Sequence, residues 1–316
     1  MANTGEEPRG RSRRAPSRAF RLLSDEPLGK GIARMAHGRI GHALDELGGA
    51  TDSTPDRAVH EARKDMKKLR SLLRLVRSGT EGRVRTRENE ALRDVGRSLS
   101  GVRDADVMLA TLGDLEESFP GDLPAEVVAP LRQQLEAHRS GITVEGTETA
   151  ELELARIRDR VRTWTPPGDD FAVVRDGLER AYRRGRRALR AAREDPTAEN
   201  LHEWRKRVKD HWYNLTVLRD VWPPVMEPLA DAAHQLSERL GEDHDLQVLL
   251  DFARSHAPGL DGADRLAALA DVIAPRREEL RAEAFALGER LYAERPRAFA
   301  SRVESLWSTW RSLGPG

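Results

Sequence analysis

Apolar residues recur along most of this chain at the three- and four-residue spacing of amphipathic helices. The spacing holds from about residue 28 to 163 and again from about 171 to 312, with short breaks rich in glycine, proline and serine. No segment shows the sustained alternation of apolar and polar residues that a half-buried strand requires. The pattern therefore predicts an all-α protein made of two series of helices.

The two helical series are separated by a segment that cannot continue a helix. Pro166 and Pro167 lack amide donors and restrict the residue before each of them. We place a linker at 164–170, between an N-terminal helical bundle at 27–163 and a C-terminal bundle at 171–316. Residues 1–26 contain six arginines among glycine, proline and serine. We expect a disordered basic arm there, either a solvated tail or an additional contact for an anion.

An eight-residue motif occurs once in each half. His60–Lys67 has the sequence HEARKDMK and His202–Lys209 has the sequence HEWRKRVK, so H-E-x-R-K-x-x-K recurs after 142 positions. About forty residues further on, LSGVRDADVML at 99–109 matches LGEDHDLQVLL at 240–250, displaced by 141 positions. Two matches at nearly the same offset predict an internal duplication.

The repeated motif places its cations on one side of a helix and its apolar residues on the other. At about 100° per residue, the cationic side of the first copy lies within roughly 80° of His60. In the first copy the cationic side consists of His60, Arg63, Lys64, Lys67, Arg70 and Arg74, and the apolar side of Ala62, Met66, Leu69, Leu73 and Val76. In the second copy the two sides are His202, Arg205, Lys206 and Lys209, and Trp204, Val208, Leu215 and Leu218.

The helix before the second copy carries a further arginine row. By the i, i+3, i+4, i+7 rule these side chains share one face. The row consists of Arg180, Arg183, Arg184, Arg187 and Arg190, and its thinner counterpart in the first half of Lys30, Arg34 and His37. A single arginine row is most often a solvated face paired with glutamate. The distribution of the lysines is more informative. Five of the chain's six lysines lie in the two repeated segments: Lys64, Lys67, Lys68, Lys206 and Lys209.

The amino-acid composition excludes several classes of function. The formal net charge is zero, so any polyanion site must come from the distribution of charge and not from its total. The absence of cysteine excludes disulfides, thiolate zinc sites and cysteine nucleophiles. No run approaches the ~20 apolar residues that span a bilayer, and we expect a soluble, cytoplasmic protein without membrane contact.

Motifs for metal or covalent chemistry are likewise missing. The position four residues after each motif histidine is Lys64 or Lys206 and not the second histidine of a zinc-protease helix. No phosphate-binding glycine loop and no nucleophile elbow occurs. We interpret Asp243-His244-Asp245 as a helix N-terminus and His211 as a core histidine. We expect no metal, no cofactor and no catalytic residue.

The two repeated motifs resemble those of the CHAD domain family, named for its conserved histidine and helical content. The resemblance covers residues 28 to about 312 and departs from the pattern at His244, which stands where Arg103 stands in the first half. It implies two four-helix bundles related by a pseudo-twofold axis, with basic helix faces around a central cavity that binds inorganic polyphosphate, in some members on polyphosphate granules. The candidate ligand-binding residues are then His60, Arg63, Lys64, Lys67, Arg70, Arg74, Arg180, Arg183, Arg184, Arg187, His202, Arg205, Lys206, Lys209, Arg34 and Arg103.

Two other functions fit part of the pattern. Paired basic faces also suit a nucleic-acid backbone, although no exposed aromatic platform or base-reading motif accompanies them. An accessory subunit of an enzyme that processes phosphate chains is the other alternative. CHAD domains are often fused to a triphosphatase with an E-x-E-x-K motif, and the nearest string here, Glu151–Ala155, lacks the lysine.

Overall fold

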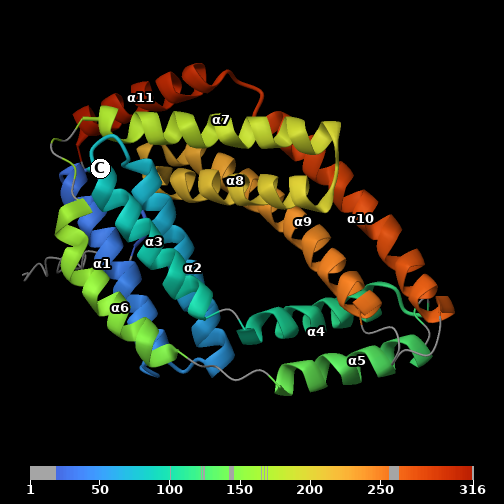
Figure 1. Ribbon diagram of the computed structural model, residues 1–316. Helices are drawn as coiled ribbons and strands as arrows, with labels where there is room; N and C mark the ends of the chain where they lie inside the picture. The colour runs from blue at the N-terminus through green and yellow to red at the C-terminus, as the bar shows by residue number, and fades with distance from the viewer. Residues whose placement is uncertain are drawn as a thin grey trace, which may run out of the picture.

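The computed structural model describes residues 19–99, 101–121, 123, 125–141, 146–164, 166, 168, 170–255 and 263–314, without the side chains of 101–104 and 263–265. Every regular element in these ranges is helical, which confirms the all-α prediction (Figure 1). The helices are α1 Leu28–Leu47, α2 Pro55–Leu75, α3 Gly82–Ser98, α4 Gly101–Ser118, α5 Ala125–Ser140, α6 Thr147–Arg160, α7 Ala172–Glu194, α8 Ala198–Val217, α9 Pro223–Ser255, α10 Ala263–Leu291 and α11 Pro296–Leu313. The short 3₁₀ helices η1 Val161–Trp164 and η2 Arg219–Val221 follow α6 and α8. None of the described helices is long and apolar enough to cross a membrane.

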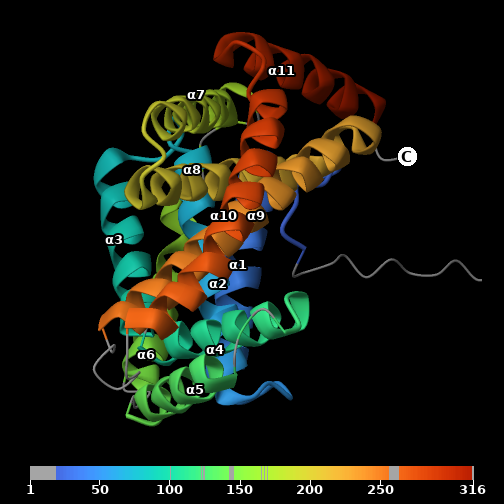
Figure 2. The same cartoon turned by 90° about the vertical axis from the view of Figure 1, so that its right-hand side faces the viewer.

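The helices share two hydrophobic cores that do not coincide with the two halves of the sequence. The larger core joins α1, α2, α3 and α6 to α7, α8, α11, the start of α9 and the end of α10. The smaller core joins α4 and α5 to the far ends of α9 and α10, at the bottom of Figure 1 and Figure 2. Because each core takes residues from both halves, the boundary at 164–170 is not a boundary between cores. The duplication stays a prediction from the repeated motifs.

The two motif helices begin in the same way. The Thr54 hydroxyl accepts a hydrogen bond from the amide of Arg57 at the start of α2, and the Thr197 hydroxyl accepts one from Asn200 at the start of α8. Such N-caps satisfy amide groups that have no partner inside the helix. The apolar sides that the sequence predicts are buried in the larger core: Ala62, Met66, Leu69, Leu73, Val76, Trp204, Val208, Leu215 and Leu218.

Close packing brings α2, α7 and α8 together. A Cβ atom at Gly177 in α7 would overlap the carbonyl oxygen of Leu75 at the end of α2, so only glycine permits this approach. Between α2 and α8, the Ser71 hydroxyl lies 3.2 Å from both the Asp210 carbonyl oxygen and the Asn214 amide oxygen. These contacts hold the cationic sides of the three helices around one region.

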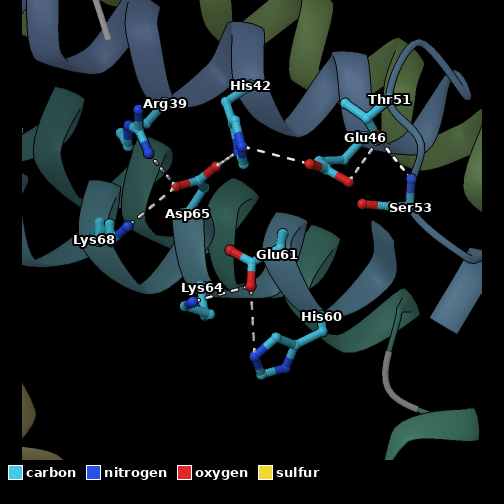
Figure 3. Close-up of polar contacts among 10 residues, drawn as sticks. All are labelled: Arg39, His42, Glu46, Thr51, Ser53, His60, Glu61, Lys64, Asp65 and Lys68. Carbon is cyan, nitrogen blue, oxygen red and sulfur yellow. Dashed lines mark hydrogen bonds and ion pairs between the residues drawn. The ribbon is translucent and has the colours of Figure 1, made fainter. Parts of the chain in front are cut away.

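A buried carboxylate holds the other side of α2 against α1 (Figure 3). Asp65 is 1% exposed and its carboxylate lies 2.7 Å from His42 Nδ1, 3.2 Å from an Arg39 guanidinium nitrogen and 3.7 Å from Lys68 Nζ. A buried carboxylate is tolerated only when charges and hydrogen bonds compensate it. In α9 and α10, Asp243 has the same role, with Arg277 and Arg281 each 2.9 Å away. Asp243-His244-Asp245 therefore lies inside α9, and our interpretation of it as a helix N-terminus is wrong.

Part of the arm that the sequence predicts at 1–26 packs against the helices. Leu22 is buried and its amide donates to the Val217 carbonyl, while Arg21 contacts Asp220. Apolar contact and main-chain bonding at Leu22 outweigh the polar composition around it. Residues 19–26 therefore do not form a disordered arm, and residues 1–18, the rest of the predicted arm, lie outside the described part of the chain.

His211 is a core histidine, as the sequence predicts. It is fully buried in α8, and its ring lies beside those of Tyr182, Tyr292 and Phe299. Burial lowers the pKa of the imidazole from 6.5 to about 3. The folded protein therefore keeps this side chain uncharged at neutral pH.

We expect His211 to make the folded protein acid-sensitive. Its stabilising contribution is complete above pH 6.5 and disappears as the pH falls towards about 3, since the unfolded chain then binds a proton that the folded chain excludes. At pH 5 the loss amounts to about 2 kcal/mol. Urea unfolding at pH 7 and pH 5 should show that His211→Leu removes about this much of the pH dependence. The partly exposed His234 supplies the control, and a pH dependence in His211→Leu equal to that of His234→Leu would contradict the expectation.

Candidate functional site

A cavity of about 380 Å³ lies between α2 and α8. Its lining from α2 is wholly cationic: Arg63, Lys67, Arg70 and Arg74. Its lining from α8 consists of His202, Arg205, Lys206, Arg207, Lys209, Asp210 and Tyr213. Two pairs of equivalent motif positions thus line this central cavity, Arg63 with Arg205 and Lys67 with Lys209.

A second pocket of about 310 Å³ continues the basic surface towards α3 and α7. This arginine pocket shares three residues with the central cavity, and its lining is Arg70, Leu73, Arg74, Arg85, Thr86, Asn89, Arg184 and Arg207. A smaller gap beside it is lined by Arg77 from the turn after α2 and by Arg180 and Arg184 from α7. Arg74 and Arg207 line this gap as well. Arg74 and Arg207 therefore stand where all three spaces meet.

The cations of the arginine pocket destabilise one another. The pKa of Arg70 is lowered, first by burial and then by the nearby charge of Arg74, and the pKa of Arg184 is lowered by burial and by Arg207. Arginine stays charged at neutral pH, so these shifts record an unfavourable electrostatic environment. A bound anion would relieve it.

One carboxylate lies among these cations. Of the described residues that line the three spaces, only Asp210 is acidic. It accepts a hydrogen bond from Arg74 of α2 and lies 3.8 Å from Arg207 of its own helix. Asp210 thereby ties the two basic rows together across the helix contact.

Sequence reasoning missed several of these residues. Arg207 and Asp210 lie roughly 140° and 80° from His202 on α8, so the first is outside the stripe and the second is acidic. Asn89 in α3 accepts from Arg70 at 3.0 Å and comes from a helix that carries no repeated motif. These residues can be recognised as part of the site only from the contacts between α2, α3 and α8. Asp210 lies three residues after Arg207, and this i, i+3 spacing was the one signal available in the sequence.

Some predicted residues lie away from the central cavity. His60 and Lys64 both contact Glu61, at 3.8 and 2.9 Å (Figure 3), while Arg183 is exposed and bonds Glu179. Arg187 is exposed on α7. Arg34 serves the fold instead: it donates to Glu26 and to the carbonyl oxygens of Ala19 and Arg21, so it holds the segment before α1.

The second repeated motif also contains a predicted site residue, Arg103. Its side chain lies outside the described residues. In the second copy of this motif, Asp245 lies 3.8 Å from Arg205.

His202 is held uncharged in the cavity wall. Its pKa is lowered to about 4, first by burial and then by His244, Lys206 and Arg205. The buried Nδ1 of His202 and the buried Nε atoms of Arg74 and Arg205 have no hydrogen-bond partner in the described part of the chain. Buried polar groups of this kind cost about 1–3 kcal/mol each when unsatisfied. No group of three His, Cys, Asp or Glu residues within the described ranges could hold a metal ion.

Comparison with known proteins identifies the fold. A family model described as "CHAD domain" matches residues 34–254, which is more than half of the chain. The crystal structure of the CHAD domain from the plant Ricinus communis is similar with a TM-score of 0.57 and 17% identity, covering 92% of this chain and 95% of that one. PptA from Streptomyces chartreusis has the same TM-score and identity, covering 85% of this chain and 100% of that one. No curated protein matches the sequence.

Asp210→Asn tests whether this carboxylate neutralises the two arginines. The change keeps the side-chain shape and removes the charge, and we expect the free energy of unfolding to fall by about 1–3 kcal/mol. Added phosphate should restore stability to this variant more than to the parent, because the anion can take the place of the carboxylate. Thermal unfolding against phosphate, at ionic strength kept constant with chloride, measures both effects.

The control is Asp251→Asn, which removes the carboxylate of the exposed Arg254–Asp251 pair on α9, where the two groups lie 3.2 Å apart. Exposed pairs contribute about 0–1 kcal/mol, so phosphate should not distinguish this variant from the parent. An equal response of the two variants to phosphate would show that Asp210 has no special relation to the cavity.

Proposed function

The chain belongs to the CHAD domain family, and from this membership and the cationic cavity we propose that it binds inorganic polyphosphate between α2 and α8 without catalysing a reaction. The observation that carries the proposal is the cavity itself, where corresponding cations of the two motifs face each other. Asp210 is the one carboxylate in its described lining. Such a surface attracts a ligand with many anionic groups more strongly than a single anion.

The chemistry of the lining suits a phosphate chain. Polyphosphate carries closely spaced anionic oxygens, and hydrogen bonds between charged partners are roughly twice as strong as neutral ones. The unpartnered Nε atoms of Arg74 and Arg205 are donors that phosphate oxygens could satisfy. Arginine offers a planar fork, whereas Lys67 and Lys209 offer compact charges on flexible stems. The mixture suits a chain that binds without a fixed register.

The proposal includes location and the lack of catalysis. We place the protein in the cytoplasm, where it binds free polyphosphate or polyphosphate granules. Hydrolysis of phosphate chains normally requires a metal held by carboxylates. Incubation of the protein with polyphosphate and magnesium should release no orthophosphate. Release that depends on cavity residues would overturn the non-catalytic part of the proposal.

Calorimetric titration with long-chain polyphosphate tests the site. We expect binding to weaken at least about tenfold between 50 and 200 mM salt, because cations that neutralise phosphates release counterions. Lys67→Glu combined with Lys209→Glu should weaken binding at least about 100-fold, since two charge-assisted contacts become repulsive. Lys64→Glu combined with Lys206→Glu should have a smaller effect, because Lys206 lines the central cavity but Lys64 does not.

Arg156→Glu combined with Arg254→Glu is the matched control. It changes the net charge equally at two exposed arginines outside the cavity, on α6 and α9. Its affinity should stay within about threefold of the parent. Equal losses in the two double variants would reduce the effect to total charge, and competition by duplex DNA at similar concentration would favour a nucleic-acid ligand.

A further inference from the structure

The second half of the chain places two imidazoles together, one of which lies in the wall of the central cavity. The rings of His202 in α8 and His244 in α9 have centroids 4.5 Å apart, with planes inclined at 38°. His202 lines the cavity, and its buried Nδ1 has no hydrogen-bond partner among the described residues. In the first half, the residue that corresponds to His244 is Arg103, which is permanently charged. The two halves therefore differ at this point in whether the cationic charge depends on pH.

The surroundings of the pair are mainly cationic. On α8 itself, Arg205 and Lys206 oppose a charge on His202, and Glu203 favours it. From α9, His244 also opposes it, while Asp245 is directed to Arg205. From α2, the lining of the cavity contributes Arg63, Lys67, Arg70 and Arg74. Of the other described elements that pack on α8, α7 lies on the opposite face, where His211 meets Tyr182, and η2 follows its C-terminal end.

Without an anion, this arrangement keeps His202 neutral near pH 7. Burial lowers its pKa most, followed by the charge of His244 and then those of Lys206 and Arg205. Two imidazoles in ring contact cannot both be charged without strong repulsion. A phosphate group beside them reverses the balance, because an opposite charge favours the imidazolium and its N–H groups then donate charge-assisted hydrogen bonds.

We propose that the His202–His244 pair is a protonation-dependent phosphate contact, in which binding of polyphosphate in the central cavity is coupled to uptake of a proton by the pair. The inference rests on the proposed function and adds its regulation. Binding tightens as the pH falls from 8 towards 6, and the effect belongs to the second half of the site. His60, the motif histidine of the first half, lies 3.8 Å from Glu61 and does not line the central cavity.

The test is calorimetric titration of the full chain with long-chain polyphosphate at pH 6, 7 and 8, at constant ionic strength and in two buffers of different ionisation enthalpy. A long chain is used because terminal phosphates titrate near pH 6 and must be a small fraction of the ligand. The buffer dependence of the heat gives the number of protons taken up. We expect net uptake and an affinity that rises with acidity, up to about tenfold per pH unit for one proton.

Three variants separate the pair from other titrating groups. His244→Arg restores the residue of the first half and should bind with little dependence on pH and with less proton uptake. His202→Asn should lose the uptake as well, and His60→Asn should keep it. Far-ultraviolet circular dichroism at each pH verifies folding, and His244→Asn replaces His244→Arg if the arginine does not fit.

The imidazole signals in the proton NMR spectrum provide a second measurement. The signal that His202→Asn removes should titrate near pH 4 in the free protein and above pH 6 with polyphosphate bound. Tight binding without proton uptake, or uptake that persists in His202→Asn and His244→Arg, overturns the inference and leaves the proposed function standing. Absence of polyphosphate binding by the parent at every pH overturns the proposed function itself.

Discussion

The arrangement of the molecule depends on holding two cationic helix faces together against their mutual repulsion. Two like charges 4 Å apart near a protein surface repel by about 4 kcal/mol, and cations of both α2 and α8 line the central cavity. Burial of one leucine-sized side chain contributes about 1.5–3 kcal/mol, and both helices bury a full apolar side. Packing against the larger core therefore outweighs the repulsion, and the cavity lies between the two cationic helix faces.

Asp210 limits that repulsion where α8 contacts α2. Its carboxylate contacts Arg74 of α2, and its carbonyl oxygen accepts from Ser71 of the same helix. Three deeply buried carboxylates lie outside the lining of the cavity and pair with arginines of adjacent helices. They are Asp65, Glu88 and Asp243. A chain with no net charge thus separates its charges in space. Acidic groups stabilise helix contacts, and the cationic residues collect around the cavity.

The sequence predicted the parts that depend on periodicity. The helical class and the two apolar sides follow from spacing along one helix, as do the cavity-lining positions Arg63, Lys67, Arg205 and Lys209. The parts that it missed depend on contacts between distant segments. Arg34 looked like a cavity cation because it lies in a basic row, but Glu26, eight residues earlier in an irregular segment, binds it. The smaller core, built from α4, α5, α9 and α10, has no marker in any one helix.

The roles of arginine and lysine at the site differ for a physical reason. Arg63 donates to the Leu99 carbonyl oxygen and Arg74 bonds both Asn89 and Asp210, so these guanidinium groups are fixed before any ligand arrives. Fixed donors lose little conformational entropy on binding, whereas each lysine loses up to about 2 kcal/mol when its side chain is immobilised. In the proposed complex, the arginines therefore provide most of the preorganised field. In that complex the lysines adapt to phosphates at varying positions, and this role would explain why a chain that elsewhere uses arginine has lysine in both motifs.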